Sequence, residues 1–374
     1  MSKLNLGNDL YLKGRIGWRG LSKDEYLDYS NYKIINATSL MDGYVDWSKC
    51  GYISKERYEE SEEIMLQEND ILISKDGTLG KIGYVKNWEK YCTVSSGIFV
   101  LRNTKPELLD FNYLYHILKS NVFKDFIRRN KAQGSTISHL YQRDLANFEL
   151  ELPPLETQKY IANILDSIES QIARNHNMVH KLQVLSQTVF NYYYSNSNKK
   201  TVKLKTIAKM YQPETITGSD FIENGKYPVY GSGGIIGRYD KYNHTDSELM
   251  ISCRGLCGNI SLSLPYSWII GNQMIIKPSD LKLKYYLYNY LQIINLKKVE
   301  TGSVQKQITR ANLENLDVEL LEENILSLIA NRLELIHNEL IKVIKMNDKL
   351  NSLKNTLLPL LINQQLTYKK SPIF

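Results

Sequence analysis

The sequence predicts an α+β chain with an internal repeat. Two globular domains of mixed α and β structure are each followed by one long helix, and the two helices pair as an antiparallel coiled coil under a pseudo-twofold axis. Two observations predict this fold. Apolar residues between 153 and 195 recur in alternating steps of four and three, which places them on one narrow face of a helix. The same spacing returns 168 residues later, so one unit is present twice.

The two helices carry matching stripes, which we call the seam. The seam comprises Ile161, Leu165, Ile168, Ile172, Asn175, Val179, Leu182 and Val189 in the first helix, and Ile329, Leu333, Ile336, Leu340, Val343, Asn347, Leu350 and Leu357 in the second. An antiparallel pair with Asn175 facing Asn347 lets the two amides bond each other. A parallel pair would bury each amide opposite a valine. The alternative is that each stripe packs only on its own globular domain.

The repeat divides the chain into five segments. We expect a first globular domain at 1–152, a spacer helix at 153–195, a second globular domain at 196–320, a second spacer helix at 321–366 and a C-terminal tail at 367–374. Asn196–Lys200 reads as a short polar linker.

Within the first domain, Ser22–Tyr29 suggests a short helix capped by Ser22. A strand at 71–73, a turn at Asp76-Gly77 and a returning strand at 81–85 follow. Residues 97–102 suggest another strand, and 110–129 have helical spacing. The second domain repeats this plan, because 248–263 resembles 70–85 and 300–320 resembles 132–152, so length differences lie in loops.

Composition indicates a globular protein. The 374 residues are 43% hydrophobic, and no run of about 18 apolar residues could form a membrane helix. The N-terminus lacks a signal-peptide core, which predicts a cytoplasmic location. The net charge is +7, yet residues 1–150 hold 21 basic and 20 acidic side chains. A nucleic-acid surface would therefore require charges gathered on one side of each domain.

Catalytic motifs are not apparent. The four cysteines are scattered without a second pair or a histidine cluster, which favours incidental thiols over a metal site. Gly77–Lys81 lacks the first glycine of a phosphate loop, and the glycine-rich Tyr230–Gly237 has Ile236 at the third glycine position of a dinucleotide motif. Leu152 precedes the double proline, where an amino-methyltransferase motif has Asp or Asn. We expect a non-catalytic chain without metal or cofactor.

Two unlike domains held apart by a stiff helix pair suit a ligand with two separated sites. Double-stranded DNA is such a ligand, because the distance between half-sites follows its turn of about 34–36 Å.

The chain resembles the specificity subunit of type I restriction–modification enzymes. The resemblance rests on LPPLETQKYIANILDSIESQI and its weaker partner VELLEENILSLIANRLELIHNELI, on YPVYGSGGIIGRYD, on ILISKDGTLGKIGYV with MISCRGLCGNISLS, and on QGSTISHL. These segments span essentially the whole chain. The first half lacks the glycine-rich element and has GRIGWRGL near its start, which suggests that the two domains belong to different subgroups.

The resemblance implies that each globular half is a target recognition domain for one half of a bipartite, asymmetric DNA site. The helices would set the spacer and dock two methyltransferase subunits, which use S-adenosylmethionine. Two motor–nuclease restriction subunits would use ATP and Mg²⁺. This chain would hold none of these cofactors.

Base readout needs polar side chains on exposed loops, with basic groups on phosphates. Our DNA-binding candidates are Lys75, Thr78, Lys81, Ser135, Thr136, His139 and Tyr141 in the first half, and Tyr230, Ser232, Arg238, Tyr239, Arg254, Ser303, Gln305 and Lys306 in the second. Simpler roles are open: turn residues for Lys75 and Arg254, helix caps for Ser135 and Ser303, and a structural histidine for His139.

Two other functions remain open. The chain could be a protein-interaction scaffold that binds no nucleic acid, which the near-neutral first domain favours. It could instead be a self-sufficient DNA enzyme. Salt-dependent DNA binding separates the first from a specificity subunit, and activity assays of the chain alone separate the second.

Overall fold

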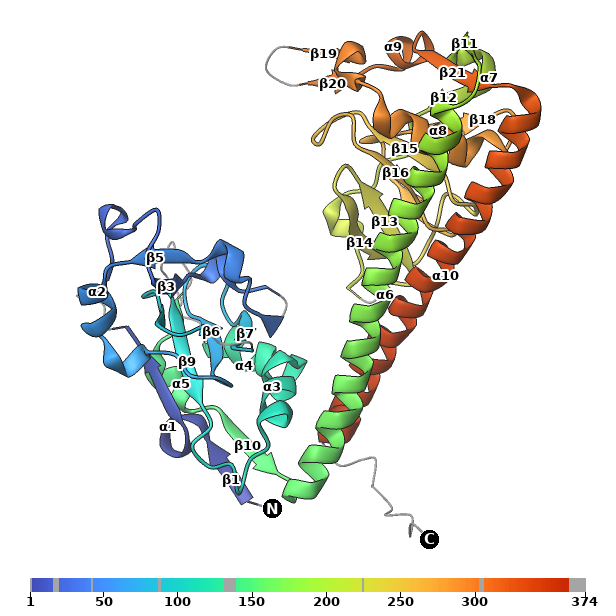
Figure 1. Cartoon of the computed structure of the whole chain (residues 1–374). Coiled ribbons are helices and arrows are strands. Elements are labelled where there is room, and N and C mark those ends of the chain that lie inside the picture. Colours follow the sequence, from blue (N-terminus) through green and yellow to red (C-terminus); the bar gives the residue numbers. More distant parts are fainter. Residues whose placement is uncertain are drawn as a thin grey trace. The chain divides into compact units, whose positions relative to one another are not determined.

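The computed structural model describes residues 2–15, 20–41, 43–86, 89–130, 139–223, 225–302 and 306–362. The chain divides into two compact units, unit 1 comprising 1–171 and 350–374 and unit 2 comprising 172–349. Two long helices, α6 (Leu155–Ser195) and α10 (Glu323–Ile362), cross this division (Figure 1). Each unit therefore holds one globular domain and one portion of each long helix.

Unit 1 contains short strands and helices around two sheets. Its strands are β1 (Ser2–Asn5), β2 (Tyr11–Gly14), β3 (Tyr32–Ile35), β4 (Gly43–Tyr44), β5 (Gly51–Ile53), β6 (Ile71–Ser74), β7 (Ile82–Tyr84), β8 (Cys92–Val94), β9 (Ile98–Arg102) and β10 (Glu149–Leu152). Its shorter helices are α1 (Leu6–Asp9), α2 (Lys55–Glu59), α3 (Phe111–Lys119), α4 (Asn121–Asn130) and α5 (Gln142–Ala146). The sheets run β2-β9-β6-β7-β4 and β5-β3-β8, and β1 pairs with β10 in a separate ribbon.

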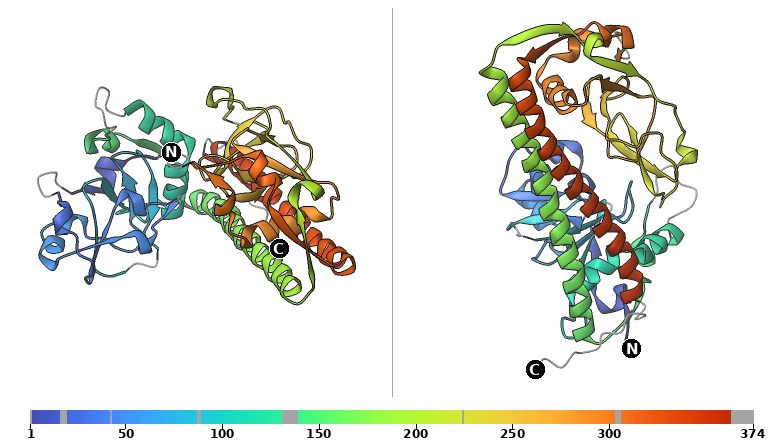
Figure 2. Two further views of the ribbon diagram at one scale, coloured as in Figure 1. Left: turned by 90° about the horizontal axis from the view of Figure 1, so that it is seen from above. Right: turned by 90° about the vertical axis from the view of Figure 1, so that its right-hand side faces the viewer.

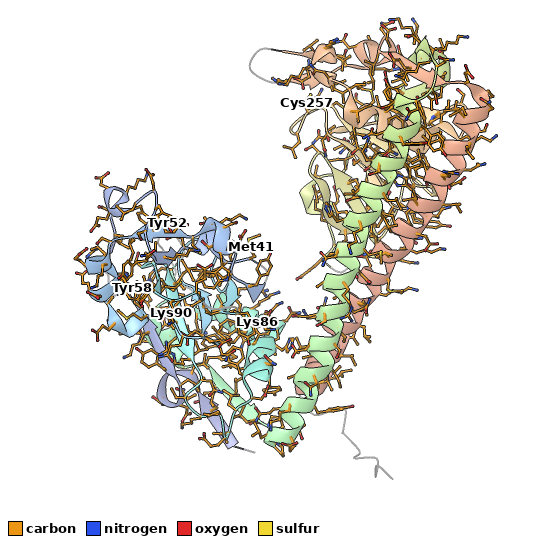
Figure 3. All side chains as sticks on the ribbon, viewed as in Figure 1. Met41, Tyr52, Tyr58, Lys86, Lys90 and Cys257 are labelled. Atoms are coloured by element: carbon orange, nitrogen blue, oxygen red, sulfur yellow. The ribbon has the colours of Figure 1, made fainter. Side chains whose placement is uncertain are left out.

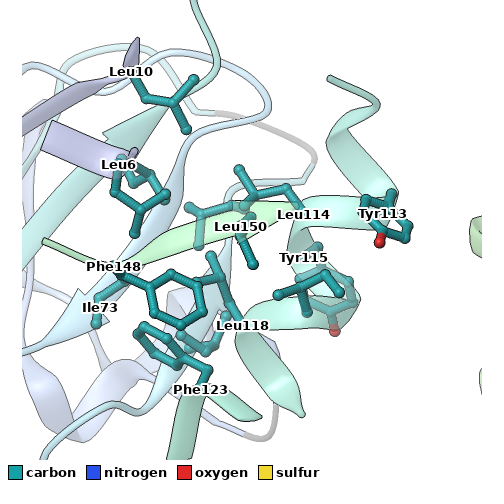
Figure 4. Close-up of a cluster of buried hydrophobic side chains, with 14 of the residues drawn as sticks. Leu6, Leu10, Ile73, Tyr113, Leu114, Tyr115, Leu118, Phe123, Phe148 and Leu150 are labelled. Atoms are coloured by element: carbon teal, nitrogen blue, oxygen red, sulfur yellow. The ribbon is translucent and has the colours of Figure 1, made fainter. Parts of the chain in front are cut away.

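The core of unit 1 lies between the five-stranded sheet and its helices. Leu118 of α3 and Phe123 of α4 meet Ile73 and Phe148 there (Figure 4). The cluster also contains the first turns of α6 and the end of α10, through residues such as Leu165 and Leu358. The seam of the helices and the core of the domain are thus continuous in unit 1.

Unit 2 repeats this architecture. Its strands are β11 (Lys199–Lys203), β12 (Ala208–Tyr211), β13 (Tyr227–Gly231), β14 (Gly234–Tyr239), β15 (Leu249–Ser252), β16 (Ile260–Leu262), β17 (Trp268–Ile269), β18 (Gln273–Pro278), β19 (Glu300–Thr301), β20 (Gln307–Ile308) and β21 (Asp317–Leu321). Its shorter helices are α7 (Leu204–Ile207), α8 (Leu283–Ile293) and α9 (Arg310–Glu314). The sheets run β12-β18-β15-β16 and β14-β13-β17, with ribbons β11-β21 and β19-β20.

The three-stranded sheets of the two units have the same pairing pattern, and the larger sheets share four strands in the same order, which confirms the internal repeat. β13 pairs parallel with β17 and antiparallel with β14, as β3 pairs with β8 and β5. The glycine-rich segment Tyr227–Asp240 is therefore the hairpin β13–β14, and its counterpart β3–β5 exists in unit 1. Only the connection differs, because residues 36–50 replace a two-residue turn. The first domain therefore has this hairpin, although its sequence lacks the glycine-rich segment. The two domains differ here in the length of the loop that joins the two strands.

The long helices pair antiparallel, as the asparagines predict. In unit 2 the Asn175 Nδ2 donates to Asn347 Oδ1 at 2.7 Å, and Asn347 Nδ2 donates to the Ile172 carbonyl at 3.3 Å. Farther along α6, Ser186 Oγ lies 3.1 Å from His337 Nε2, which is nearer the start of α10. Rising numbers in α6 thus meet falling numbers in α10, and the helices lie side by side in unit 2 (Figures 1 and 2).

The polar seam contacts differ between the repeats. In unit 1, Glu169 Oε1 lies 2.5 Å from Lys354 Nζ and 3.0 Å from Lys119 Nζ. Burial opposes ionisation, but the two lysines lower the pKa of Glu169 to about 2. The repeat-equivalent positions in unit 2 hold His337 and Ser186, and burial lowers the pKa of His337 to about 4. An ion pair in one copy is therefore replaced by a neutral contact in the other.

Every predicted seam residue is buried or half-buried. The first turns also face their own domains, because Ile161 and Leu165 belong to the unit 1 core and Ile329 and Leu333 to the unit 2 core. The seam residues of each long helix therefore serve two contacts: some pack against the globular domain, and the helix also pairs with the other long helix.

Some local predictions were wrong. The helical segment 110–129 is two helices, because Ser120 adopts an extended conformation between α3 and α4 (φ −76°, ψ 165°). The linker 196–200 is shorter than expected, since Lys199 already pairs with Leu321 in β11–β21. Ser22 caps a single 3-10 turn rather than a helix. The predicted tail 367–374 lies outside the described residues. No helix in the described part of the chain has the length and apolarity needed to cross a bilayer.

Candidate functional site

The candidate site in unit 1 is built on the β6–β7 loop, residues 74–81. Two glycines give the loop its turns, with φ of 67° at Gly77 and 72° at Gly80. Ser74 Oγ accepts from the Lys81 N–H at 2.9 Å and donates to the Thr78 carbonyl at 2.5 Å. The loop is thus held closed from inside, and Thr78 and Lys81 are exposed on it.

A second segment lies against this loop. The Leu140 N–H donates to the Lys75 carbonyl at 2.9 Å, and the His139 ring nitrogen contacts the Asp76 carboxylate. The His139 ring also meets the Tyr141 ring at 4.9 Å between centroids. The structure therefore brings five of the candidate positions in the first half (Lys75, Thr78, Lys81, His139 and Tyr141) to one loop pair.

Lys75 has a more structural environment than its neighbours. Its Nζ lies 4.8 Å from the centroid of the Phe99 ring, and burial lowers the pKa of Lys75. Lys81 instead lines a hollow of about 530 Å³ together with Lys124. Lys81 is therefore the better placed of the two lysines for a phosphate contact.

Unit 2 builds the same loop from β15 to β16, residues 252–259. Gly255 and Gly258 have φ of 78° and 81°, and the Gly258 N–H donates to the Ser252 carbonyl at 2.9 Å. The Ile308 N–H donates to the Cys253 carbonyl at 3.1 Å, as Leu140 does to Lys75. The two units thus share one backbone frame.

The side chains on the shared frame differ between the units. Arg254 and Leu256 stand where unit 1 has Asp76 and Thr78, and Gln307 stands where unit 1 has His139. A frame of equal shape therefore presents a different set of donors, acceptors and apolar groups in each unit.

The β13–β14 turn adjoins this loop in unit 2. Ser252 Oγ donates to the Ser232 carbonyl at 3.0 Å, and Gln273 Nε2 donates to the Gly231 carbonyl at 2.6 Å. Sequence reasoning missed the apolar side chains here: Leu256 is 61% and Ile235 51% exposed. Leucine and isoleucine are usually buried, so the sequence offered no reason to expect these two side chains on the surface.

Three candidates in unit 2 take part in folding the hairpin. Tyr230 is buried, and its hydroxyl accepts from the Leu264 N–H at 3.1 Å. Arg238 Nε donates to the Gly225 carbonyl at 2.7 Å, and the Tyr239 ring packs edge-on against Trp268. These placements argue against direct base contact by the three residues.

The remaining candidates are only partly placed. Lys306 is exposed and lies 3.1 Å from the Glu300 carboxylate, at the end of the β19–β20 loop. Ser135, Thr136, Ser303 and Gln305 lie outside the described residues.

A second surface runs along the long helices. Met178, Leu185 and Tyr192 of α6 are spaced by seven residues and are 49%, 46% and 65% exposed. The positions 168 residues later on α10 are Met346, Leu353 and Leu360, of which the first two are 52% and 47% exposed. We call these six residues the repeated apolar stripe. Comparing surface positions between the repeats, as we did for the seam, would have revealed it.

A family model described as "Type I restriction modification DNA specificity domain" matches residues 17–183 and 196–355. The chain belongs to this family. The two matches fall on the two repeats and end within the two long helices. Members of the specificity subunit family are non-catalytic.

Two relatives and one solved structure illustrate the similarity. The putative type I restriction enzyme MjaX specificity subunit of Methanocaldococcus jannaschii is 24% identical over an alignment 396 positions long, which includes 94% of this chain and 91% of that protein. The type I restriction enzyme EcoKI specificity subunit of Escherichia coli K12 is 28% identical over 153 residues, or 40% of this chain and 31% of that protein. The crystal structure of the S subunit of a type I restriction–modification system from M. genitalium shares the fold, with a TM-score of 0.58 and 18% identity over 96% of this chain and 95% of that one.

Proposed function

We propose that this specificity chain recognises a bipartite, asymmetric site in double-stranded DNA, with one half-site read by each globular domain. The observation that carries the proposal is the shared loop frame with unlike side chains. Two readers of equal shape would approach DNA in the same way, while different side chains would select different bases. Two unlike half-sites follow from this arrangement.

The exposed and half-buried side chains on the frame have distinct roles in this proposal. Thr78 and His139 in unit 1 and Ser232 in unit 2 present hydroxyl or imidazole groups suited to base edges. Arg254 suits a guanine, and Lys81 suits a phosphate. Lys306 and the candidates outside the described residues remain predictions from the sequence.

Mapping methylated adenines in the host with and without this chain would give the DNA site. Binding of the chain with its methyltransferase subunits to that site should then fall steeply with salt. Arg254→Ala should cost ~1–3 kcal/mol and relax preference at one position. Lys203→Ala is a matched control, because Lys203 pairs with Asp317 on the β11–β21 ribbon, away from the frame.

Complex formation with salt-independent or absent DNA binding would leave the scaffold function standing. Methylation or cleavage by the chain alone, supplied with S-adenosylmethionine, ATP and Mg²⁺, would reveal a self-sufficient enzyme. We expect neither result, because we assign these cofactors to partner subunits that act with this chain in the cytoplasm.

We also infer that the repeated apolar stripe docks two copies of a methyltransferase subunit, to which two motor–nuclease restriction subunits are added. A surface methionine or leucine contributes little to a helix facing water, yet these positions stay apolar in both repeats. Two equal surfaces suit two copies of one partner.

The stoichiometry of the purified complex tests this docking. Met178→Glu and Met346→Glu should each remove one methyltransferase subunit, and the double variant should remove both. Gln183→Glu is the control, since Gln183 is exposed on α6 outside the stripe. Full occupancy in the double variant would place the docking surface elsewhere.

A further inference from the structure

Unit 1 contains three tyrosines packed against one another beside its three-stranded sheet. Tyr32 opens β3, Tyr58 lies in α2, and Tyr91 precedes β8. Their ring centroids lie 5.1 Å (Tyr32–Tyr58), 5.3 Å (Tyr32–Tyr91) and 6.1 Å (Tyr58–Tyr91) apart. Figure 3 labels Tyr58 and Lys90 in the same part of this unit. We call this group the first tyrosine trio.

Unit 2 contains a second tyrosine trio. Tyr227 opens β13, Tyr266 precedes β17, and Tyr242 follows β14. The centroids lie 5.0 Å (Tyr227–Tyr242), 5.3 Å (Tyr242–Tyr266) and 6.5 Å (Tyr227–Tyr266) apart. Both trios thus stand at the start of the central strand of a three-stranded sheet.

Strand register shows that two members of each trio are equivalent. In unit 1 the parallel pairing places Ile35 beside Val94. In unit 2 it places Tyr230 beside Ile269, and both pairs are buried in the core under the sheet. A tyrosine of the trio stands three residues before each of these paired residues. These tyrosines are Tyr32 and Tyr91 in unit 1, and Tyr227 and Tyr266 in unit 2. These tyrosines therefore occupy the same places in the two repeats.

The second tyrosine of each equivalent pair has an unfavourable backbone. Tyr91 has φ of 60° and Tyr266 has φ of 57°, in the left-handed region that favours glycine. Among the other non-glycine residues that the structure describes, only Asn69 has a positive φ. Their side chains are 49% and 48% exposed, so burial of the ring does not explain the choice. A strained residue retained in both repeats points to a function of its side chain.

Lysines accompany the tyrosines. Lys90 precedes Tyr91, and the Nζ of Lys226 lies 5.1 Å from the centroid of the Tyr227 ring. Within the described residues neither lysine forms an ion pair, and Glu89, the neighbour of Lys90, pairs with Lys33 at 2.5 Å. The exposed tyrosines are Tyr91 in the first trio and Tyr242 and Tyr266 in the second, and an exposed lysine adjoins each trio in sequence.

We propose that the two tyrosine trios bind the sugar–phosphate backbone of DNA, one trio at each half-site. This inference rests on the proposed DNA recognition and deepens it. Loops that read bases must differ between the domains because the half-sites differ. The phosphate backbone is the same at both half-sites, so the two tyrosines that the repeats share can bind it in both domains. Tyrosine hydroxyls and lysines are common phosphate donors.

The test uses the full chain assembled with its methyltransferase subunits. Tyr91→Gly and Tyr266→Gly remove the ring but suit the positive φ, so folding is preserved. Each should weaken binding about three- to tenfold, on the cognate duplex and on an unrelated duplex alike. Tyr91→Phe and Tyr266→Phe keep the ring and should give most of the same loss. Lys90→Gln and Lys226→Gln should each lower the salt slope of binding by about 0.9.

Asn69→Gly is the control for relief of backbone strain, and it should leave DNA binding unchanged. Glycine variants that bind both duplexes like the unchanged protein would overturn the inference. Loss confined to the cognate duplex would assign the trios to base readout instead, and loss of bound methyltransferase subunits would make them a protein interface. If the unchanged complex binds no DNA, the proposed function fails first, which distinguishes the two failures.

Discussion

The asparagine pair of the long helices allows a quantitative test with a control supplied by the repeat. Asn175 and Asn347 are 7% and 5% exposed and are joined at 2.7 Å. The repeat-equivalent positions are Val343 and Val179. Asn347→Val removes the acceptor of the Asn175 amide and should destabilise unit 2 by about 1–3 kcal/mol. For a unit of this size, the melting temperature should fall by about 2–4 °C per kcal/mol.

The double variant Asn175→Val, Asn347→Val removes both polar groups and reproduces the valine pair already present. It should recover most of the stability lost by either single variant, because replacing both partners by apolar groups is nearly neutral. Thermal unfolding followed by far-UV circular dichroism gives the interaction energy of the cycle. A double variant as unstable as the sum of the two single variants would refute the pairing as the determinant of register.

Three further predictions concern single residues. The pKa of His337 is about 4 in the fold and 6.5 in the free side chain, so the unfolded state takes up the proton first as pH falls. The free energy of unfolding of unit 2 should therefore fall by about 3 kcal/mol between pH 6.5 and pH 4. His337→Gln should flatten this pH dependence in denaturant titrations. Glu169→Gln should destabilise unit 1 by about 3 kcal/mol at pH 7 and have little effect at or below pH 2, because the native carboxylate keeps its charge down to about pH 2 while the unfolded one loses it below 4.5. Equal losses at both pH values would contradict this. Gly255→Ala should weaken DNA binding more than Gly77→Ala, since an added Cβ meets the Ser232 Oγ at 2.7 Å in the first case and open space in the second; equal effects would show that backbone strain alone matters.

The long-range architecture could be predicted because it is encoded in period and repetition. Heptad spacing fixed the two helices, and Asn175 with Asn347 fixed their direction, since a buried amide needs a partner. The loop pair around Gly77 and Gly255 was also predicted, because glycines mark positions of positive φ.

The surface chemistry was harder to predict, for physical reasons. A tyrosine near a glycine-rich turn can face either way, and only the tertiary fold shows that Tyr230 is buried. Ser120 ends a helix through a backbone conformation that hydrophobic spacing does not report. The tyrosine trios were missed because their members come from separate segments that meet only in the folded sheet. The DNA contacts of the candidate loops remain predictions.

The ribbons β1–β10 and β11–β21 have a consequence for how such proteins diversify. Each ribbon joins the first strand of a globular domain to its last strand, and the last strand leads directly into a long helix. Two residues lie between Leu152 and the start of α6, and one residue lies between Leu321 and the start of α10. The entry and exit of each domain are therefore neighbours on one small hydrogen-bonded platform. The segments between Asn5 and Glu149, or between Lys203 and Asp317, could be replaced without moving the platform, provided that contacts to the long helices such as Lys119 with Glu169 are kept. We expect such an exchange to change the loops of the candidate site while leaving the pairing of the long helices in place.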